Sequence, residues 1–163
     1  MTKSLDLGCG PNPQNPFNAD EVFGIDIRMS QNSNIFVADL NIEKIPFPNN
    51  FFDYITAFDF IEHVPRILYL NERRFPFIEL MNEVYRTLKN GGIFYSFTPA
   101  FPKAPAWRDP THVNIITDET FTKYFDNSER LAKMYGFTGS FKIVEQYWHS
   151  DDIHLISVLQ KID

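Results

Sequence analysis

The residues best suited to chemistry stand near the start of the chain, in the segment SLDLGCGPNPQNPFNADEVFGID at positions 4–26. An apolar, strand-like run leads into Gly8-Cys9-Gly10, and a second apolar run ends on Asp26. Glycines at the end of a strand let the backbone approach a ligand closely, because no Cβ intervenes. An acid about twenty residues further on is placed to accept from the hydroxyl groups of a ribose. The pattern therefore predicts a site for a ligand that contains a nucleoside.

Three prolines after this turn argue against a dinucleotide. In the GxGxxG fingerprint, a third glycine packs a helix on the strand, and the N-terminus of that helix faces a pyrophosphate. This chain has Pro13 where the third glycine would stand, and Pro11, Pro13 and Pro16 forbid a regular helix across 11–18. A nicotinamide-dependent oxidoreductase is therefore disfavoured.

Acids around the same turn favour a cationic ligand that carries no phosphate. Asp6, Asp26 and Asp39 each lie within or at the end of an apolar run. S-adenosylmethionine combines a sulfonium, a ribose and an adenine, and carboxylates are good acceptors for its hydroxyl and amino groups. The alternative interpretation is a tight strand-to-loop turn that binds nothing.

Five segments, taken in order, carry a family resemblance: LDLGCGPNP, GIDI, VADLN, FDYITAFDFIEHV and EVYRTLKNGGIFYSFTP. Their order and spacing resemble those of the class I S-adenosylmethionine-dependent methyltransferases, closely from Ser4 to Pro99 and more loosely beyond, in the manner of the small type 11-like methyltransferase domains. The resemblance implies an α/β, doubly wound, Rossmann-like fold with a seven-stranded sheet whose last strand is antiparallel. The fold is expected to be trimmed at its N-terminus, because the chain begins almost directly at the first strand.

Composition and charge fit one globular domain, 1–163, in the cytoplasm. The chain has 163 residues, of which 44% are hydrophobic and 22% charged, which is enough to bury a core. The net charge of −6 disfavours a nucleic-acid partner, since such binding rests mainly on Lys and Arg. A single cysteine, no signal peptide and no apolar run of about eighteen residues favour a cytoplasmic protein outside the membrane.

The resemblance assigns the cofactor to residues at the ends of the first four predicted strands: Asp6, Gly8, Gly10, Asp26, Ile27, Asp39, Leu40 and Phe58. The first three would hold the methionine part of S-adenosylmethionine. Asp26 would accept both ribose hydroxyls, because a carboxylate offers two acceptor oxygens. Asp39 would accept from the adenine amino group, with the Leu40 amide beside it, and Phe58 would face the sulfonium. For Asp39 the alternative is a helix cap.

A second group could carry acid–base or metal chemistry. In a helical turn, Asp59, Glu62 and His63 would share one face by their i, i+3, i+4 spacing, and His112 follows in RDPTHVN. The group resembles the ExxEH metal-binding element of small-RNA 3′-end 2′-O-methyltransferases and ubiquinone-pathway O-methyltransferases, with Asp59 replacing the first Glu. The resemblance implies Mg²⁺ at these four residues, although histidine is not its usual ligand. Alternatively, His63 or His112 removes a proton from an acceptor oxygen, or the pair Glu62-His63 only packs.

Periodicity and turn residues predict the elements that must position these groups. An apolar stripe predicts a helix over 72–89, ended by a left-handed cap at Asn90-Gly91-Gly92. Pro76 is expected in its first turn, or else as its true start. Two short helices are expected over 118–125 and 128–135. The predicted strands cover 4–7, 22–26, 34–38, 52–58, 92–98, 141–148 and 153–160.

The expected function is direct transfer of the methyl group of S-adenosylmethionine to a small molecule, with oxygen slightly favoured as the accepting atom. Phe101, Trp107 and Arg108 would form a wall of the substrate pocket or else anchor a long loop. One alternative is a non-catalytic S-adenosylmethionine-binding regulatory subunit, with a partner subunit covering the open N-terminal side. Another is a Mg²⁺-dependent RNA 2′-O-methyltransferase, which the negative charge disfavours.

Overall fold

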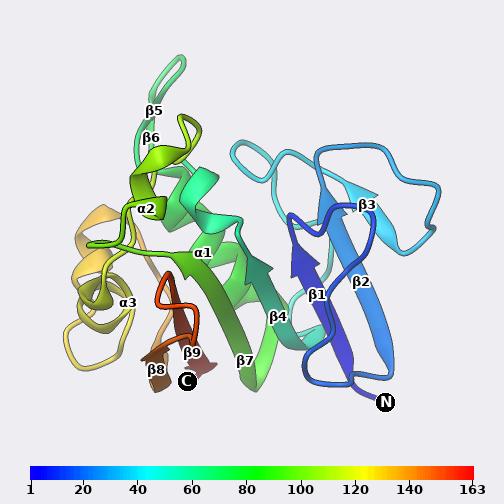
Figure 1. The fold of residues 1–163 in the computed structure, drawn as a ribbon. Helices are drawn as coiled ribbons and strands as arrows, with labels where there is room; N and C mark the ends of the chain where they lie inside the picture. Colours follow the sequence, from blue (N-terminus) through cyan, green and yellow to red (C-terminus); the bar gives the residue numbers. More distant parts are fainter.

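The computed structural model describes residues 1–163 and contains a seven-stranded mixed sheet in the order β3-β2-β1-β4-β7-β9-β8 (Figure 1). Adjacent strands from β3 to β7 are parallel, and β9 runs antiparallel to both β7 and β8. The predicted fold class, including the antiparallel last strand, is confirmed. The strands are β1 (Lys3–Leu7), β2 (Glu21–Asp26), β3 (Ile35–Val37), β4 (Phe52–Phe58), β7 (Leu88–Pro99), β8 (Phe141–Trp148) and β9 (His154–Lys161).

The strand order reverses between β1 and β4. From β1 the chain moves outward to β2 and β3, and it then returns to the other side of β1 as β4. In open α/β sheets, ligands bind outside the carboxyl ends of the strands at such a reversal. The fold therefore places the predicted cofactor residues at the edge of the sheet where a ligand is expected.

Helices and short hairpins connect the strands: η1 (Ile61–His63), β5 (Leu68–Tyr69), β6 (Arg73–Arg74), α1 (Pro76–Thr87), α2 (Pro105–Arg108), α3 (Asp118–Tyr124) and η2 (Leu131–Tyr135). The amphipathic helix α1 links β4 to β7 and buries Phe77, Leu80, Met81 and Val84 against the sheet. Thr117 caps α3 with a side chain that accepts from Glu119 N–H. No helix has the length and apolar character needed to cross a membrane.

One of the two predicted starts of the helix over 72–89 is confirmed, and its predicted end is wrong. The helix begins at Pro76, because Arg73–Arg74 pairs with β5 in a small hairpin. It ends at Thr87, with Leu88 already extended, so Asn90-Gly91-Gly92 lies inside β7 instead of capping the helix. The left-handed residue expected there does exist, since Gly91 has φ +77°, but it sits within the strand.

The core is rich in phenylalanine. One group of rings packs edge to face where β2, β3 and β4 begin: Phe23, Phe36, Phe47, Phe51 and Phe52. A second group lies between α1, α3 and the sheet: Phe77, Phe94, Phe121, Phe125, Phe137 and Phe141. Many of the phenylalanines are therefore core residues that pack against one another.

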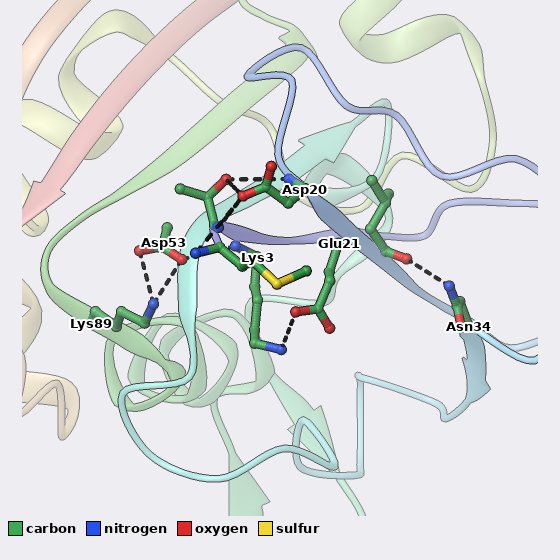
Figure 2. Close-up of polar contacts among 9 residues, drawn as sticks. Lys3, Asp20, Glu21, Asn34, Asp53 and Lys89 are labelled. Atoms are coloured by element: carbon green, nitrogen blue, oxygen red, sulfur yellow. Dashed lines mark hydrogen bonds and ion pairs between the residues drawn. The ribbon is translucent and has the colours of Figure 1, made fainter.

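The amino ends of the strands are joined by polar contacts (Figure 2). Lys89 Nζ lies 2.8 Å from Asp53 Oδ2, and the same carboxylate oxygen accepts from the Lys3 N–H. Lys3 Nζ in turn lies 2.7 Å from Glu21 Oε1. These contacts link β1, β2, β4 and β7 at the edge opposite the predicted site.

The loop 11–19 between β1 and β2 contains no helix, as its prolines predict. It crosses the face of the sheet that carries Tyr54. The ring of Phe17 stacks on Tyr54 with centroids 4.4 Å apart, and it meets Tyr95 edge-on at 6.0 Å. Aromatic stacking thus holds the loop where a crossover helix would otherwise pack.

Candidate cofactor and acceptor site

The turn after β1 requires glycine at two positions. Gly8 has φ +66° and Gly10 has φ +58°, in the left-handed region that favours glycine. A Cβ on Gly8 would lie 2.4 Å from Cδ2 of Phe60, which is closer than carbon atoms can approach. The Gly10 N–H donates to Asp26 Oδ2 over 2.8 Å and so joins the carboxyl ends of β1 and β2.

Asp26 presents an ionised carboxylate beside this turn. Its side chain is 6% exposed, and hydrogen bonds from Arg28, with a further one from Gly10 N–H, lower the pKa of the carboxyl to about 2. Oδ1 accepts from the Arg28 backbone N–H at 2.9 Å and from Arg28 Nε at 2.8 Å, and Oδ2 lies 3.2 Å from Arg28 Nη2. The Arg28 side chain is 71% exposed, so it can move away when a diol takes its place.

Asp6, the residue of β1 two positions before Gly8, is buried and hydrogen-bonded to the loop that follows the turn. Its carboxylate is 1% exposed and accepts from the Gln14 N–H at 2.8 Å and from the Thr56 hydroxyl at 2.7 Å. Burial raises the pKa of Asp6 to about 6. These bonds fasten the loop 11–19 to β1 and β4, and the predicted contact of Asp6 with the cofactor stays a prediction.

Cys9 is a packing residue in this turn. Its Sγ lies 3.2 Å from the Gly10 carbonyl, and it faces Gly24 so closely that a Cβ there would be 2.4 Å from the sulfur. Burial, together with the nearby carboxylates of Asp6 and Asp26, raises the pKa of the thiol to about 12. The side chain is therefore a neutral thiol at physiological pH and not a nucleophile.

The residues predicted to bind an adenine follow the end of β3. Asp39 Oδ1 accepts from the Asn41 N–H at 3.0 Å, so this side chain caps the turn that follows. Leu40 is buried, and its backbone N–H takes part in none of the hydrogen bonds of this loop. Ile27, after β2, is 64% exposed, and Phe58 lies between Tyr95 and Phe97 at the end of β4.

Glu62 is a buried carboxyl near the end of β7. It is 1% exposed, and its Oε2 accepts from the Thr98 hydroxyl at 2.7 Å. Its Oε1 is buried without any hydrogen-bond partner. Burial raises the pKa of Glu62 to about 7, so the group exchanges a proton near neutrality. An orphaned, half-protonated carboxyl of this kind is typical of a functional site.

His63 and His112 lie next to Glu62. The two imidazole rings meet edge to face with centroids 4.8 Å apart, and the ligating atoms of all three side chains fall within 4.8 Å of one another. His63 Nδ1 lies 3.0 Å from the hydroxyl of Thr111. One carboxylate and two imidazoles form a donor set that suits transition metals better than Mg²⁺.

Asp59 does not share this group, although its spacing predicts a common helical face. The helical turn η1 begins only at Ile61, and Asp59 has the left-handed φ of +46°. Its Oδ1 lies 2.9 Å from Nε2 of His154. The i, i+3, i+4 argument fails because the residues 59–63 do not form one continuous helical turn.

A buried asparagine holds the long loop after β7 in place. Asn114 donates its side-chain amide to the Ile61 carbonyl, and the backbone N–H groups of Val113 and Asn114 both donate to the Glu62 carbonyl. Arg66 Nε donates to Asn114 Oδ1 over 2.8 Å. The sequence does not identify Asn114, Arg66 and Thr98 as site residues, because each bonds to a residue that is distant in the chain. Arg28 is not identified either, because its contact with Asp26 depends on the fold of the loop after β2.

An apolar pocket of about 400 Å³ opens beyond Arg66. Aromatic side chains from three elements line it, including Phe75, Tyr124 and Tyr135. Phe101 and Trp107 are not part of its wall; they are 49% and 60% exposed, so they do not anchor their loop in the core either. Their predicted role in binding a substrate stays a prediction.

Comparisons with known proteins identify the family of this chain. A family model described as a methyltransferase domain matches residues 5–96. The demethylmenaquinone methyltransferase of Listeria welshimeri is 26% identical over 125 residues, which cover 66% of this chain and 49% of that protein. This chain thus spans about half the length of the curated relatives it matches.

Solved structures share the fold. A SAM-dependent methyltransferase from Aquifex aeolicus superposes with a TM-score of 0.62 at 15% identity, covering 99% of this chain and 82% of the other. A second, from Archaeoglobus fulgidus, gives 0.61 at 16% identity, covering 99% and 86%. The family model covers more than half of the chain, and the sheet has the predicted seven strands with an antiparallel last strand. The chain therefore belongs to the methyltransferase domain family and has the class I S-adenosylmethionine-dependent methyltransferase fold.

Proposed function

We propose that this chain transfers the methyl group of S-adenosylmethionine directly to a small-molecule acceptor. The observation that carries the proposal is the Asp26 carboxylate, held by Gly10 at the joined ends of β1 and β2 and ionised at neutral pH. A carboxylate in this position can accept both hydroxyls of a ribose. The remaining predicted cofactor residues lie along the same edge of the sheet.

The residues present fit the cofactor. The two left-handed glycines keep the turn free of side chains, the Leu40 N–H is unused, and Asp26 offers two oxygens once Arg28 moves. When bound, S-adenosylmethionine supplies an electrophilic methyl group on a sulfonium. The protein must then hold an acceptor in line with it, and alignment of this kind supplies much of the rate.

Glu62, His63 and His112 are the groups that can handle the acceptor's proton. If the acceptor is a hydroxyl, the oxygen forms a bond to the methyl carbon as the sulfur–carbon bond breaks, and the proton leaves the oxygen. An imidazole of His63 or His112 can receive that proton. The Thr98 hydroxyl holds the buried Glu62 carboxyl beside them.

The acceptor class that suits this site is a small, largely apolar aromatic molecule, with oxygen as the favoured accepting atom. The aromatic pocket beside Arg66 is lined by none of Glu62, His63 and His112, so the assignment rests on the sequence and on the relatives. The name of the Listeria relatives, demethylmenaquinone methyltransferase, points to a small molecule of similar character. Negative net charge opposes the alternative of an RNA substrate.

The test is calorimetric titration of S-adenosylmethionine and S-adenosylhomocysteine into the wild type, Asp26→Ala and the control Asp20→Ala. Asp20 is an exposed acid at the opposite edge of the sheet. We expect binding by the wild type and Asp20→Ala, and its loss in Asp26→Ala. Equal binding by all three proteins would show that the ribose is held elsewhere.

Turnover is then measured with a radiolabelled methyl donor against small aromatic hydroxyl compounds and a short RNA, with and without Mg²⁺. Methyl transfer to an aromatic acceptor supports the proposal, and loss of transfer without Mg²⁺ would support the metal-dependent alternative. Transfer to the RNA alone would contradict the proposed acceptor class. Tight cofactor binding without turnover of any acceptor would favour the regulatory subunit.

A further inference from the structure

The turn between β8 and β9 carries a cluster of metal-ligating side chains that the proposed reaction does not use. His149, Asp151 and His154 are spaced H-x-D-x-x-H in the segment WHSDDIH, and their ligating atoms lie within 4.8 Å of one another. β9 runs antiparallel to β7, so His154 stands opposite Pro99 at the carboxyl end of β7 (Figure 1). The cluster therefore lies at the functional edge of the sheet.

Asp151 is fixed so that one oxygen faces both imidazoles. Its Oδ1 accepts from the backbone N–H groups of Ile153 and His154, at 2.9 and 3.1 Å. Its Oδ2 lies 2.5 Å from Nδ1 of His154 and 3.1 Å from Nδ1 of His149. Ligands on a tetrahedral Zn²⁺ with bonds of about 2.0–2.1 Å are separated by about 3.3 Å. The 3.1 Å separation already matches this value, and the 2.5 Å pair must open by about 0.8 Å to admit an ion.

The other side of His154 is oriented by Asp59. Asp59 Oδ1 lies 2.9 Å from Nε2 of His154, while the ring stacks on Phe97 with centroids 4.1 Å apart. Nδ1 of His154 shares a proton with Asp151 Oδ2 in this structure, and a metal ion would replace that proton. The Nε2 contact with Asp59 would then keep the ring oriented, which is the usual outer arrangement of a metal-ligating histidine. Asp59 reaches this position through its left-handed φ of +46°. This conformation costs energy, and it persists only where the surrounding structure imposes it.

We propose that His149 Nδ1, His154 Nδ1 and the Asp151 carboxylate form a binding site for a divalent transition metal ion of the Zn²⁺ class. Two imidazoles and one carboxylate select such ions over Mg²⁺. Three protein ligands leave a further position open to water or to another oxygen ligand. His149 is 41% and Asp151 31% exposed in their side chains, so an ion reaches the site from solvent.

The site is distinct from the group of Glu62, His63 and His112. Phe97, against which His154 and His149 pack, and Thr98, which holds Glu62, are neighbours in β7 and so point to opposite faces of the sheet. The two clusters therefore lie on different sides of the end of β7, and mutation can separate them.

The test is titration of the untagged, chelator-treated protein with Co²⁺, monitored by the visible absorption that Co²⁺ gains on leaving octahedral water. Zn²⁺ displacement and a parallel Mg²⁺ titration measure selectivity. We expect His149→Ala, His154→Ala and Asp151→Asn each to lose one equivalent of bound Co²⁺ per chain. Asp59→Asn should weaken binding about 10- to 100-fold.

Two matched controls make the result decisive. Asp152→Asn changes an acid in the same turn that pairs with Lys103, and His63→Ala changes the other cluster. Both control variants should keep the one equivalent of bound Co²⁺ that His149→Ala, His154→Ala and Asp151→Asn lose. Because His149 is largely on the surface, its variant should fold, which circular dichroism verifies. Unchanged Co²⁺ stoichiometry in His149→Ala and Asp151→Asn, or no Co²⁺ binding by the wild type, overturns the proposal.

Discussion

Three carboxyl groups at one edge of the sheet differ in protonation because their surroundings differ. Asp26 has a guanidinium and two backbone N–H groups as partners, and its pKa falls to about 2. Asp6 and Glu62 have only one or two neutral donors and are almost wholly buried, so their pKa values rise to about 6 and about 7. Asp26 is therefore an anion at neutral pH, whereas Asp6 and Glu62 exchange protons near neutrality, because their hydrogen-bond partners and burial differ.

The raised pKa of Glu62 predicts a pH-dependent stability. A carboxyl with a higher pKa folded than unfolded stabilises the protein when protonated, and that contribution is lost as the pH rises from about 4.5 to about 7. Glu62→Gln should therefore be more stable than the wild type at pH 8, by about 2–3 kcal/mol, and equally stable at pH 4. Urea denaturation at pH 4, 6 and 8 measures this, with the exposed Glu119→Gln as the control. Parallel pH profiles for the wild type and Glu62→Gln would contradict it.

Arg28 competes with the ribose for Asp26, because its guanidinium contacts both carboxylate oxygens. Arg28→Ala should therefore bind S-adenosylmethionine about threefold more tightly, in line with the small net worth of an exposed ion pair. Lys44→Ala removes an equal, exposed charge and should leave affinity unchanged. Calorimetric titration compares the three proteins. Weaker binding by Arg28→Ala would mean that the guanidinium turns to contact the cofactor itself.

At the scale of residues, the sequence predicts those site residues that form a motif local in the chain. Gly8, Gly10 and Asp26 are recognisable because glycines after a strand and an acid about twenty residues later are a local signature. Asp59 and His154 are not recognisable as partners, since they lie 95 residues apart and meet only through the antiparallel register of β9. The two histidines of WHSDDIH were nonetheless a visible signal, because a predicted antiparallel last strand must begin at the functional edge.

At the scale of elements, the turn after β1 depends on the close approach of Phe60 to Gly8. Gly8→Ala combines a left-handed φ with a Cβ only 2.4 Å from that ring, so we expect a loss of about 2–4 kcal/mol of stability and loss of cofactor binding. Gly91→Ala is the matched control. Its φ is also positive, but nothing lies within 4 Å of the added Cβ, so only the backbone strain of about 1 kcal/mol remains.

Chemical denaturation of both glycine variants, with calorimetric titration of the cofactor, separates these two effects. Equal stability losses in Gly8→Ala and Gly91→Ala would show that Phe60 moves aside without cost. Retained cofactor affinity in Gly8→Ala would show that the turn does not approach the ligand closely.

The elements that were predicted correctly are those with strong local patterns. The strand β4 covers 52–58 as predicted, and the predicted 141–148 is β8. The hairpin of β5 and β6 has only two residues in each strand, too few to produce an alternation, and it shifted the start of α1 to Pro76. The segment 128–135 is helical only over Leu131–Tyr135, as a 3₁₀ turn.

At the scale of the whole molecule, one seven-stranded sheet and one connected core predict one cooperative unit over 1–163. Tryptophan fluorescence, which reports on Trp107 and Trp148, and far-ultraviolet circular dichroism should therefore give coincident urea transitions. Saturating S-adenosylmethionine should shift both transitions together to higher urea. Separate midpoints for the two probes would divide the chain into two independently folding parts.

The position of β9 in the sheet has a consequence for the order of events during synthesis. β9 lies between β7 and β8, so β8 leaves the ribosome before the strand that connects it to the sheet. Until β9 inserts, β7 presents an open strand edge, which is a hazard for pairing with other chains. Insertion then places the Lys161 ammonium against the carbonyl of Leu88 at 2.7 Å, so the end of β9 closes onto the first residue of β7.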